Sequence, residues 1–138
     1  MRRFLSAVLA AVLVVIFAVP CFAATTGENA IMPRFTYFEV LTASFIIDED
    51  TGISSSNASS YSVPGYTNKI VCKLQRERTN GWTTLKTWTA TGTRYASIDQ
   101  DWAVYSGYNY RIVVTFSILD SDGTELETFT KARYYDYT

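Results

Sequence analysis

The sequence predicts an all-β fold of about seven or eight short antiparallel strands, arranged as a sandwich or a barrel. After the first 33 residues, no stretch has apolar residues at the i, i+3, i+4 and i+7 spacing of an amphipathic helix. Instead, runs of β-branched and aromatic residues alternate with short clusters of Gly, Asn, Asp and Ser, which favour turns. The chain is also rich in aromatic residues, with ten Tyr, eight Phe and three Trp in 138 residues.

The expected strands follow one another with few residues between them. The opening segment is one strand with a bulge or a pair of strands, and the second segment is rich in serine, a poor strand former. In chain order, the expected strands cover residues 34–41 with 43–47, 53–62, 69–78, 82–88, 93–98, 108–119 and 124–133. Turn-forming residues lie between them at 48–52, 63–65, 80–81, 99–101 and 120–123.

Alternation along two of these strands predicts which side chains are buried. In the third segment, the apolar side chains on one face are Ile70, Cys72 and Leu74. In the segment at 108–119, the even-numbered residues are aromatic or aliphatic and the odd-numbered ones are mostly polar. We therefore expect one face of each strand in a core and the other in contact with water.

The first residues have the three parts of a secretory signal peptide. Arg2 and Arg3 precede an apolar run at 4–19, and small residues follow it. Cleavage is expected after Ala23, because a cut after Ala24 would put a phenylalanine in a subsite that takes small side chains.

The expected organisation is thus a signal peptide at 1–23, a flexible polar leader at 24–33 and one β-domain at 34–138. A membrane anchor would need about 20 apolar residues, whereas this run ends early at Pro20. Pro20 also disfavours lipid attachment at Cys21. We expect a secreted, extracellular protein that meets a membrane only through an uncleaved signal peptide.

Composition removes several classes of function. The chain has no histidine, so neither a Ser-His-Asp or Cys-His nucleophile nor a histidine metal site can be built. The 12 basic and 13 acidic residues leave no excess of positive charge for a phosphate backbone, which disfavours nucleic-acid binding. Removal of Arg2 and Arg3 with the signal peptide changes the formal charge from −1 to −3. We expect no cofactor and no enzymatic activity.

One segment resembles the sixth strand of fibronectin type III and related immunoglobulin-like domains. The matching residues are Ser106-Gly107-Tyr108-Asn109-Tyr110-Arg111-Ile112. The resemblance implies an immunoglobulin-like antiparallel β-sandwich in which Tyr108 ties its hydroxyl to the backbone upstream and Trp102 fills an apolar position ahead of it.

A longer resemblance covers most of residues 34–137. The chain is similar to a group of small secreted proteins of Gram-positive bacteria, which carry R-[FY]-T-Y, L-Q-R, N-G-x-W-x-x-[LV]-K-x-W, S-G-Y-x-Y-R and D-x-[DN]-G-x-x-x-E-T. Here these motifs lie at 34–37, 74–76, 80–88, 106–111 and 120–128. The resemblance implies a bacterial, secreted β-sandwich and no particular activity.

Three carboxylate pairs could bind calcium or act as an acid and a base. They are Asp48/Asp50, Asp99/Asp101 and Asp120/Asp122. None has the five or six oxygens of a full calcium loop, and aspartate is favoured in turns because its side chain accepts hydrogen bonds from its own backbone. We expect turn-forming roles for all three, with Asp48 and Asp50 as the calcium candidates.

Cys72 and the tryptophans are the remaining candidates. Cys72 shares its face with aliphatic residues and has no histidine to activate it, so we expect it to pack as a small hydrophobic side chain. Trp82, Trp88 and Trp102 could stack on sugars or bind a protein. Core packing is favoured for them over surface recognition, although Trp82 and Trp88 share one parity with a lysine between them.

The sequence therefore favours a secreted, non-catalytic binding module whose partner is an extracellular protein or glycan. A small carbohydrate-active hydrolase that uses two carboxylates is the alternative from another class. A surface component that associates with itself through edge strands is the third.

Overall fold

Seven β-strands and no helix make up residues 34–138, the part of the chain that this computed structural model describes. Residues 1–33, with the expected signal peptide and leader, lie outside the described residues. No helix in the described part has the length and apolar character needed to cross a membrane. The strands are β1 (Phe38–Asp48), β2 (Ile53–Ser62), β3 (Thr67–Arg78), β4 (Gly81–Thr93), β5 (Tyr95–Ala103), β6 (Tyr108–Leu119) and β7 (Glu125–Tyr137).

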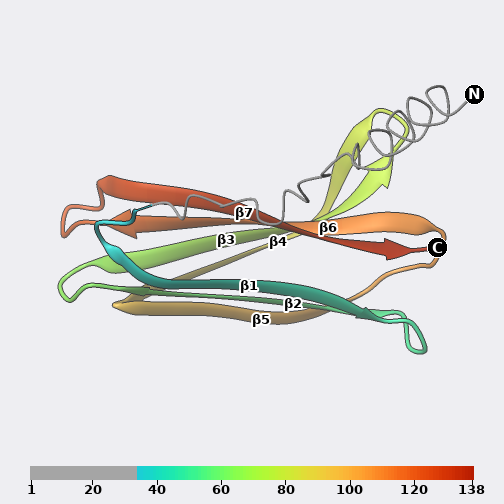
Figure 1. The fold of residues 1–138 in the computed structure, drawn as a ribbon, viewed down its shortest axis with the longest axis horizontal. Helices are drawn as coiled ribbons and strands as arrows, with labels where there is room; N and C mark the ends of the chain where they lie inside the picture. Colours follow the sequence, from blue (N-terminus) through green and yellow to red (C-terminus); the bar gives the residue numbers. More distant parts are fainter. Residues whose placement is uncertain (1–33) are drawn as a thin grey trace, which may run out of the picture. The chain divides into compact units, whose positions relative to one another are not determined.

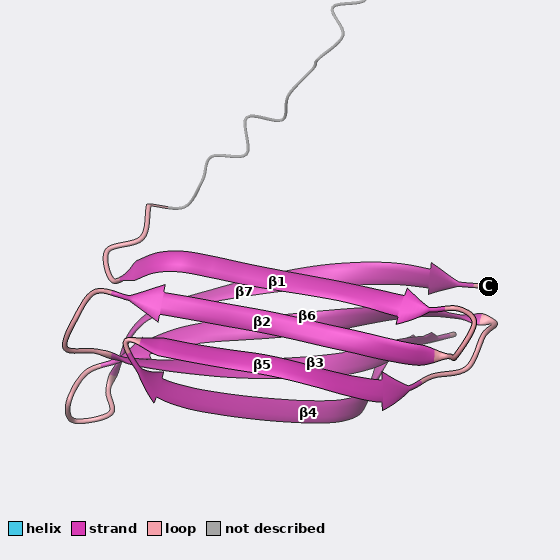
Figure 2. Cartoon of the chain, turned by 90° about the horizontal axis from the view of Figure 1, so that it is seen from below, coloured by secondary structure: helices cyan, strands magenta, loops and turns pink. Residues whose placement is uncertain are grey.

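The strands form two antiparallel sheets. One sheet has the order β1-β2-β5 and the other the order β4-β3-β6-β7. The sheets face each other as two layers (Figure 1), and Figure 2 looks at the outer face of the three-stranded one. The predicted all-β antiparallel sandwich is confirmed.

Most expected strands are present, with one clear error. The strands expected at 53–62 and 108–119 have those bounds, and the opening segment is a single strand with a register shift near its start. The turn expected at 99–101 is wrong, because β5 continues through it to Ala103. β5 pairs with β2 along its whole length while Asp99 and Asp101 point into solvent, so the acidic residues do not interrupt the strand.

Large side chains of β3 and β6 fill the core against the small inward side chains of β2. Ile70, Cys72 and Leu74 are fully buried, as their alternation predicts. The even-numbered residues of β6 from Tyr110 to Ile118 are also buried. Across from them, the inward side chains of β2 are Ser54, Ser56, Ala58, Ser60 and Ser62, all buried.

Asn68 of β3 links the two sheets inside this core. Its amide nitrogen donates a hydrogen bond to the Ser62 hydroxyl at 2.9 Å, and its amide oxygen accepts one from the Ser60 hydroxyl at 2.9 Å. Asn68, Ser60 and Ser62 are all fully buried. Because buried polar groups are costly unless paired, this bridge makes a serine-lined strand compatible with a core.

Side chains cover the side of the sandwich where β1 lies beside β7 (Figure 2). The Glu127 carboxylate accepts hydrogen bonds from the backbone N–H groups of Thr36, Tyr37 and Phe38 at 2.9–3.1 Å. Arg133 Nε donates to the Ala43 carbonyl at 3.0 Å. Backbone groups that an edge strand would leave open to another chain are thus paired within this one.

A β-bulge shapes the hairpin between β3 and β4. Leu74 pairs with Lys86 and Gln75 pairs with Thr84, so Leu85 is the extra residue on β4. A bulge bends the strand that carries it and increases its twist. Figure 1 shows the result: the tip of this hairpin leaves the plane of its sheet and turns away from the three-stranded sheet.

The tyrosine that ties β6 to the preceding loop is Tyr110, not Tyr108. The Tyr110 hydroxyl donates to the Tyr105 carbonyl at 2.8 Å and accepts from the Tyr105 N–H at 3.2 Å. Tyr110 is buried, whereas Tyr108 is 39% exposed and its ring lies 4.5 Å from the Arg76 guanidinium. Both residues lie on the same face of β6, and Tyr108 comes at the strand's first residue, where the core has ended.

Removal of the Tyr110 hydroxyl should destabilise the fold. Tyr110→Phe leaves both backbone groups of Tyr105 without their partner, so we expect the free energy of unfolding to fall by about 1–2 kcal/mol. Tyr108→Phe is the matched control and should change it by less than about 0.5 kcal/mol. Urea unfolding of both variants measures the difference. Equal losses would contradict the assignment of the tie to Tyr110.

Candidate functional site

The three tryptophans lie in different surroundings and do not form one surface. Trp82 lies on the outer face of the four-stranded sheet, beside Arg111. Trp88 pairs with Cys72 and packs, partly buried, against the core. Trp102 is 39% exposed near the end of β5, with Lys86 Nζ 4.9 Å from its ring centre. The expectation of core packing therefore describes Trp88 and not the other two.

The bulge at Leu85 separates Trp82 from Trp88. These two are six positions apart along β4, so an unbroken strand would place both on the same face. The extra residue reverses the alternation, and Trp82 pairs with Glu77 on the outer face while Trp88 faces inward. A backbone irregularity thus places Trp82 on the outer face of the sheet, where its side chain is half-buried.

Arg111 on β6 links Trp82 on β4 to Tyr134 on β7 across the outer face of the sheet. Its guanidinium lies 4.2 Å from the centre of the Trp82 ring and 5.9 Å from the centre of the Tyr134 ring. Arg111 Nε donates to Gln75 Oε1 at 2.8 Å, which fixes the guanidinium between the rings. The Trp82 and Tyr134 rings meet edge to face, 5.9 Å apart. These contacts hold the hairpin tip over the outer face of its sheet.

A hollow of about 320 Å³ lies at this place, and we call it the hairpin cleft. Its lining combines aromatic rings with hydrogen-bonding groups. The residues that line it are Glu77, Trp82, Asn109, Tyr110, Tyr134, Tyr135 and Asp136. Tyr134 is 63% exposed, so much of its side chain is accessible to a ligand. This mixture of apolar walls and a few placed polar groups is typical of a small-ligand site.

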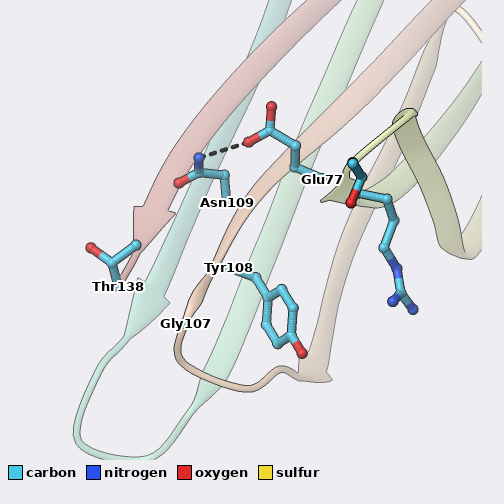
Figure 3. A pocket seen from close by; sticks show the side chains of 7 residues that line it. Glu77, Gly107, Tyr108, Asn109 and Thr138 are labelled. Carbon is cyan, nitrogen blue, oxygen red and sulfur yellow. Dashed lines mark hydrogen bonds between the residues drawn. The ribbon is translucent and has the colours of Figure 1, made fainter.

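A second hollow, of about 550 Å³, adjoins the cleft and shares Glu77 and Asn109 with it. Asn109 Nδ2 donates to Glu77 Oε2 at 2.7 Å, and Figure 3 shows this pair between the hairpin and the start of β6. Gly107, Tyr108 and Thr138 line the opposite side. The Glu77–Asn109 pair therefore presents polar atoms to both hollows.

The carboxylate pairs do not gather into one site. Asp48 Oδ1 accepts the backbone N–H groups of Asp50 and Thr51, and Asp120 Oδ1 accepts those of Asp122 and Thr124. These are turn roles, as expected for the two pairs. Asp99 and Asp101 lie instead on the outer face of β5, where Asp101 accepts a hydrogen bond from Ser55 at 2.6 Å.

No group of three or more Cys, Asp or Glu side chains within residues 34–138 is arranged to hold a metal ion. The calcium candidates Asp48 and Asp50 lie in the turn after β1, where Asp48 Oδ1 is occupied by backbone donors.

Cys72 is a buried free thiol in the middle of β3. Burial away from water raises its pKa from 9.0 to about 11, because the thiolate is poorly solvated there. Its side chain is fully inaccessible. Cys72 thus packs as a small apolar side chain, as expected.

Sequence reasoning missed Arg111, Glu77 and Asn109 as parts of a site. The odd-numbered residues of β6 were expected only to face water, whereas Ser117 is buried and the others are half-buried. The register between strands is what identifies these residues as neighbours: Glu77 pairs with Trp82, and Asn109 pairs with Asp136. Only the observed pairing, with its bulge, brings these side chains together.

Comparison with protein-family models gave no match, and comparison with curated protein sequences gave none either.

The thiol of Cys72 should be unreactive in the folded protein. At pH 8 the raised pKa lowers the thiolate fraction about 100-fold relative to an unfolded chain. Labelling with a thiol reagent, with and without denaturant, should show modification only of the unfolded chain. Between pH 9.0 and about 11 the unfolded chain loses this proton first, so the free energy of unfolding should fall as pH rises through that window. Rapid labelling of the folded protein would contradict this account.

Proposed function

We propose that this chain is a secreted, non-catalytic binding module whose ligand enters the hairpin cleft. The observation that carries the proposal is the placement of Trp82. A bulge turns this ring out of the sandwich, and Arg111 and Tyr134 hold it over a hollow of about 320 Å³. Large aromatic rings are more often buried than held at a surface, so their presentation beside a hollow favours recognition.

The chemistry of the cleft favours a glycan as the ligand. Trp82 and Tyr134 offer apolar ring faces and edges of the kind that pack against sugar rings. The exposed carboxylates of Glu77 and Asp136 can accept hydrogen bonds from sugar hydroxyl groups, and the Asn109 amide holds the Glu77 carboxylate in place. Two carboxylates beside the rings disfavour an acidic ligand. A protein partner is the other class that these residues could recognise.

Secretion and membership of a wider group belong to the same proposal. The three-part segment at 1–23 supports secretion. The motifs at 34–37, 80–88 and 106–111 support kinship with small secreted proteins of Gram-positive bacteria. The sandwich with a tyrosine tie at the start of β6 supports an immunoglobulin-like or fibronectin type III-like module.

The hydrolase alternative has less support. Two of the three carboxylate pairs accept backbone hydrogen bonds in turns, and the third lies on the outer face of β5. The two carboxylates of the hairpin cleft, on Glu77 and Asp136, are separated on the sheet by β6. We therefore assign these two groups to binding.

Loss of the Trp82 ring should weaken ligand binding. The protein should be obtained by expression of the full chain in a secreting host, applied to a glycan array and titrated with the glycans that bind. We expect Trp82→Ala to lower affinity about tenfold or more. The matched control Trp102→Ala removes an exposed tryptophan elsewhere and should change affinity by less than about twofold.

The outcomes separate the ligand classes and the site. Failure of every glycan to bind, with capture of an extracellular protein that depends on Trp82, would overturn the glycan assignment and keep the cleft. Equal effects of the two tryptophan variants would overturn the cleft as the site. Thermal unfolding of both variants checks that each remains folded.

The secreted protein should begin at Ala24. Signal peptidase prefers small side chains at the positions that Cys21 and Ala23 occupy. Mass spectrometry of protein collected from the medium measures the N-terminus. Recovery of the chain only in the membrane fraction, with Met1 retained, would contradict the expected secretion.

A further inference from the structure

The positive charges of the strands are confined to one sheet. β1, β2 and β5 contain no lysine or arginine, whereas β3, β4, β6 and β7 contain eight. The three-stranded sheet nevertheless carries Asp99 and Asp101, both exposed on the outer face that Figure 2 shows. The charged side chains of the three-stranded sheet are therefore all acidic, whereas basic residues outnumber acidic ones in the four-stranded sheet.

The outer face of the three-stranded sheet also exposes apolar side chains. Val40 is 49% exposed, Ile46 60%, and Tyr61 and Tyr95 42% each. Tyr61 and Tyr95 lie side by side with ring centres 4.4 Å apart. We call this surface, made by Val40, Ile46, Tyr61, Tyr95, Asp99 and Asp101, the cation-free face. Exposed apolar side chains that share one face of a small domain mark an interaction surface.

The middle of the cation-free face is made of small side chains, and a hollow of about 280 Å³ lies there. Rows across β1, β2 and β5 read Thr42-Ser59-Ser97 and Ser44-Asn57-Asp99. The Thr42 and Ser59 hydroxyls are hydrogen-bonded to each other at 2.7 Å. A surface of this kind lets a second sheet approach to the roughly 10 Å of ordinary sheet packing. A β-branched surface with positive charge would fit it.

The chain itself offers that surface on its other layer. We define the lysine face as the outer side chains Lys69, Val71, Lys73, Val113, Thr115 and Thr130 of the four-stranded sheet. Lys69 and Lys73 are exposed, and they flank the half-buried Val71. The small and β-branched side chains Val113, Thr115 and Thr130 lie beside them on the neighbouring strands.

We propose that the cation-free face of one copy packs on the lysine face of a second copy. The charges are complementary, since Asp99 and Asp101 meet Lys69 and Lys73. The contact uses different faces of the two copies, so each copy keeps one face open and association continues head to tail. This contact joins the faces of two sheets and does not pair edge strands. At the edges of β1 and β7, Glu127 and Arg133 already bridge the two strands within the chain.

Sedimentation velocity of the protein secreted from the full chain tests the proposal, at about 10 µM to 1 mM. We expect larger species as concentration rises, and fewer of them when salt is raised from about 0.02 M to 0.5 M. Asp99→Lys with Asp101→Lys, and separately Lys69→Glu with Lys73→Glu, should each weaken association about tenfold or more by placing like charges together. The mixture of the two variants should associate again, because their altered faces are complementary.

Asp122→Lys is the control, since it reverses an exposed charge in the turn between β6 and β7, outside the residues of both faces. Thermal unfolding of each variant checks its fold. A protein that stays monomeric at about 1 mM in low salt overturns the proposal. Association that survives both face variants, or a mixture that fails to associate, also overturns it.

Discussion

The architecture depends on a central strand whose inward side chains are small. β2 lies between β1 and β5, and it presents four serines and one alanine to the core. Small side chains let the sheets approach, and Phe116 and its large neighbours on β6 then fill the space between them. Serine hydroxyls would be costly there without partners. Asn68 on the opposite sheet pairs with two of them, Ser60 and Ser62, and Ser54 donates to the Trp102 carbonyl at 2.7 Å. Of the four hydroxyls, the one on Ser56 has no hydrogen-bond partner.

The serine-lined strand also explains where the chemistry of the molecule lies. The inward side chains of β2 and β6 are buried, and the hairpin cleft lies on the outer surface. There one extra residue, Leu85, decides that Trp82 faces outward. The bulge turns Trp82 outward and bends the hairpin over its sheet, where Arg111 and Tyr134 hold it. The cleft therefore results from a local change in strand geometry and not from a long loop.

The alternation of apolar and polar residues along a strand predicts which side chains are buried, but only while the strand is uninterrupted. The burial of Ile70, Cys72 and Leu74 and of the β6 core follows from a period of two, which an uninterrupted strand must obey. The opposite orientations of Trp82 and Trp88 could not be predicted, because nothing in the composition around Leu85 marks a bulge. Tyr108 and Tyr110 share one parity, so alternation alone cannot say which hydroxyl reaches Tyr105. The cleft could not be predicted without the register between strands that are distant in the sequence.

The hairpin also bears on how a second copy would pack. Its tip lies over the outer face of the four-stranded sheet, across the row that contains Gln75, Arg111 and Tyr134. The row with Lys73 and Val113 follows immediately, and Lys69 lies further along. A second sheet placed on the lysine face would therefore meet the hairpin at one end and could not slide past it. The bulge that builds the cleft would thus also limit how a second copy can shift along the lysine face. The cleft would lie beside the second copy and not beneath it.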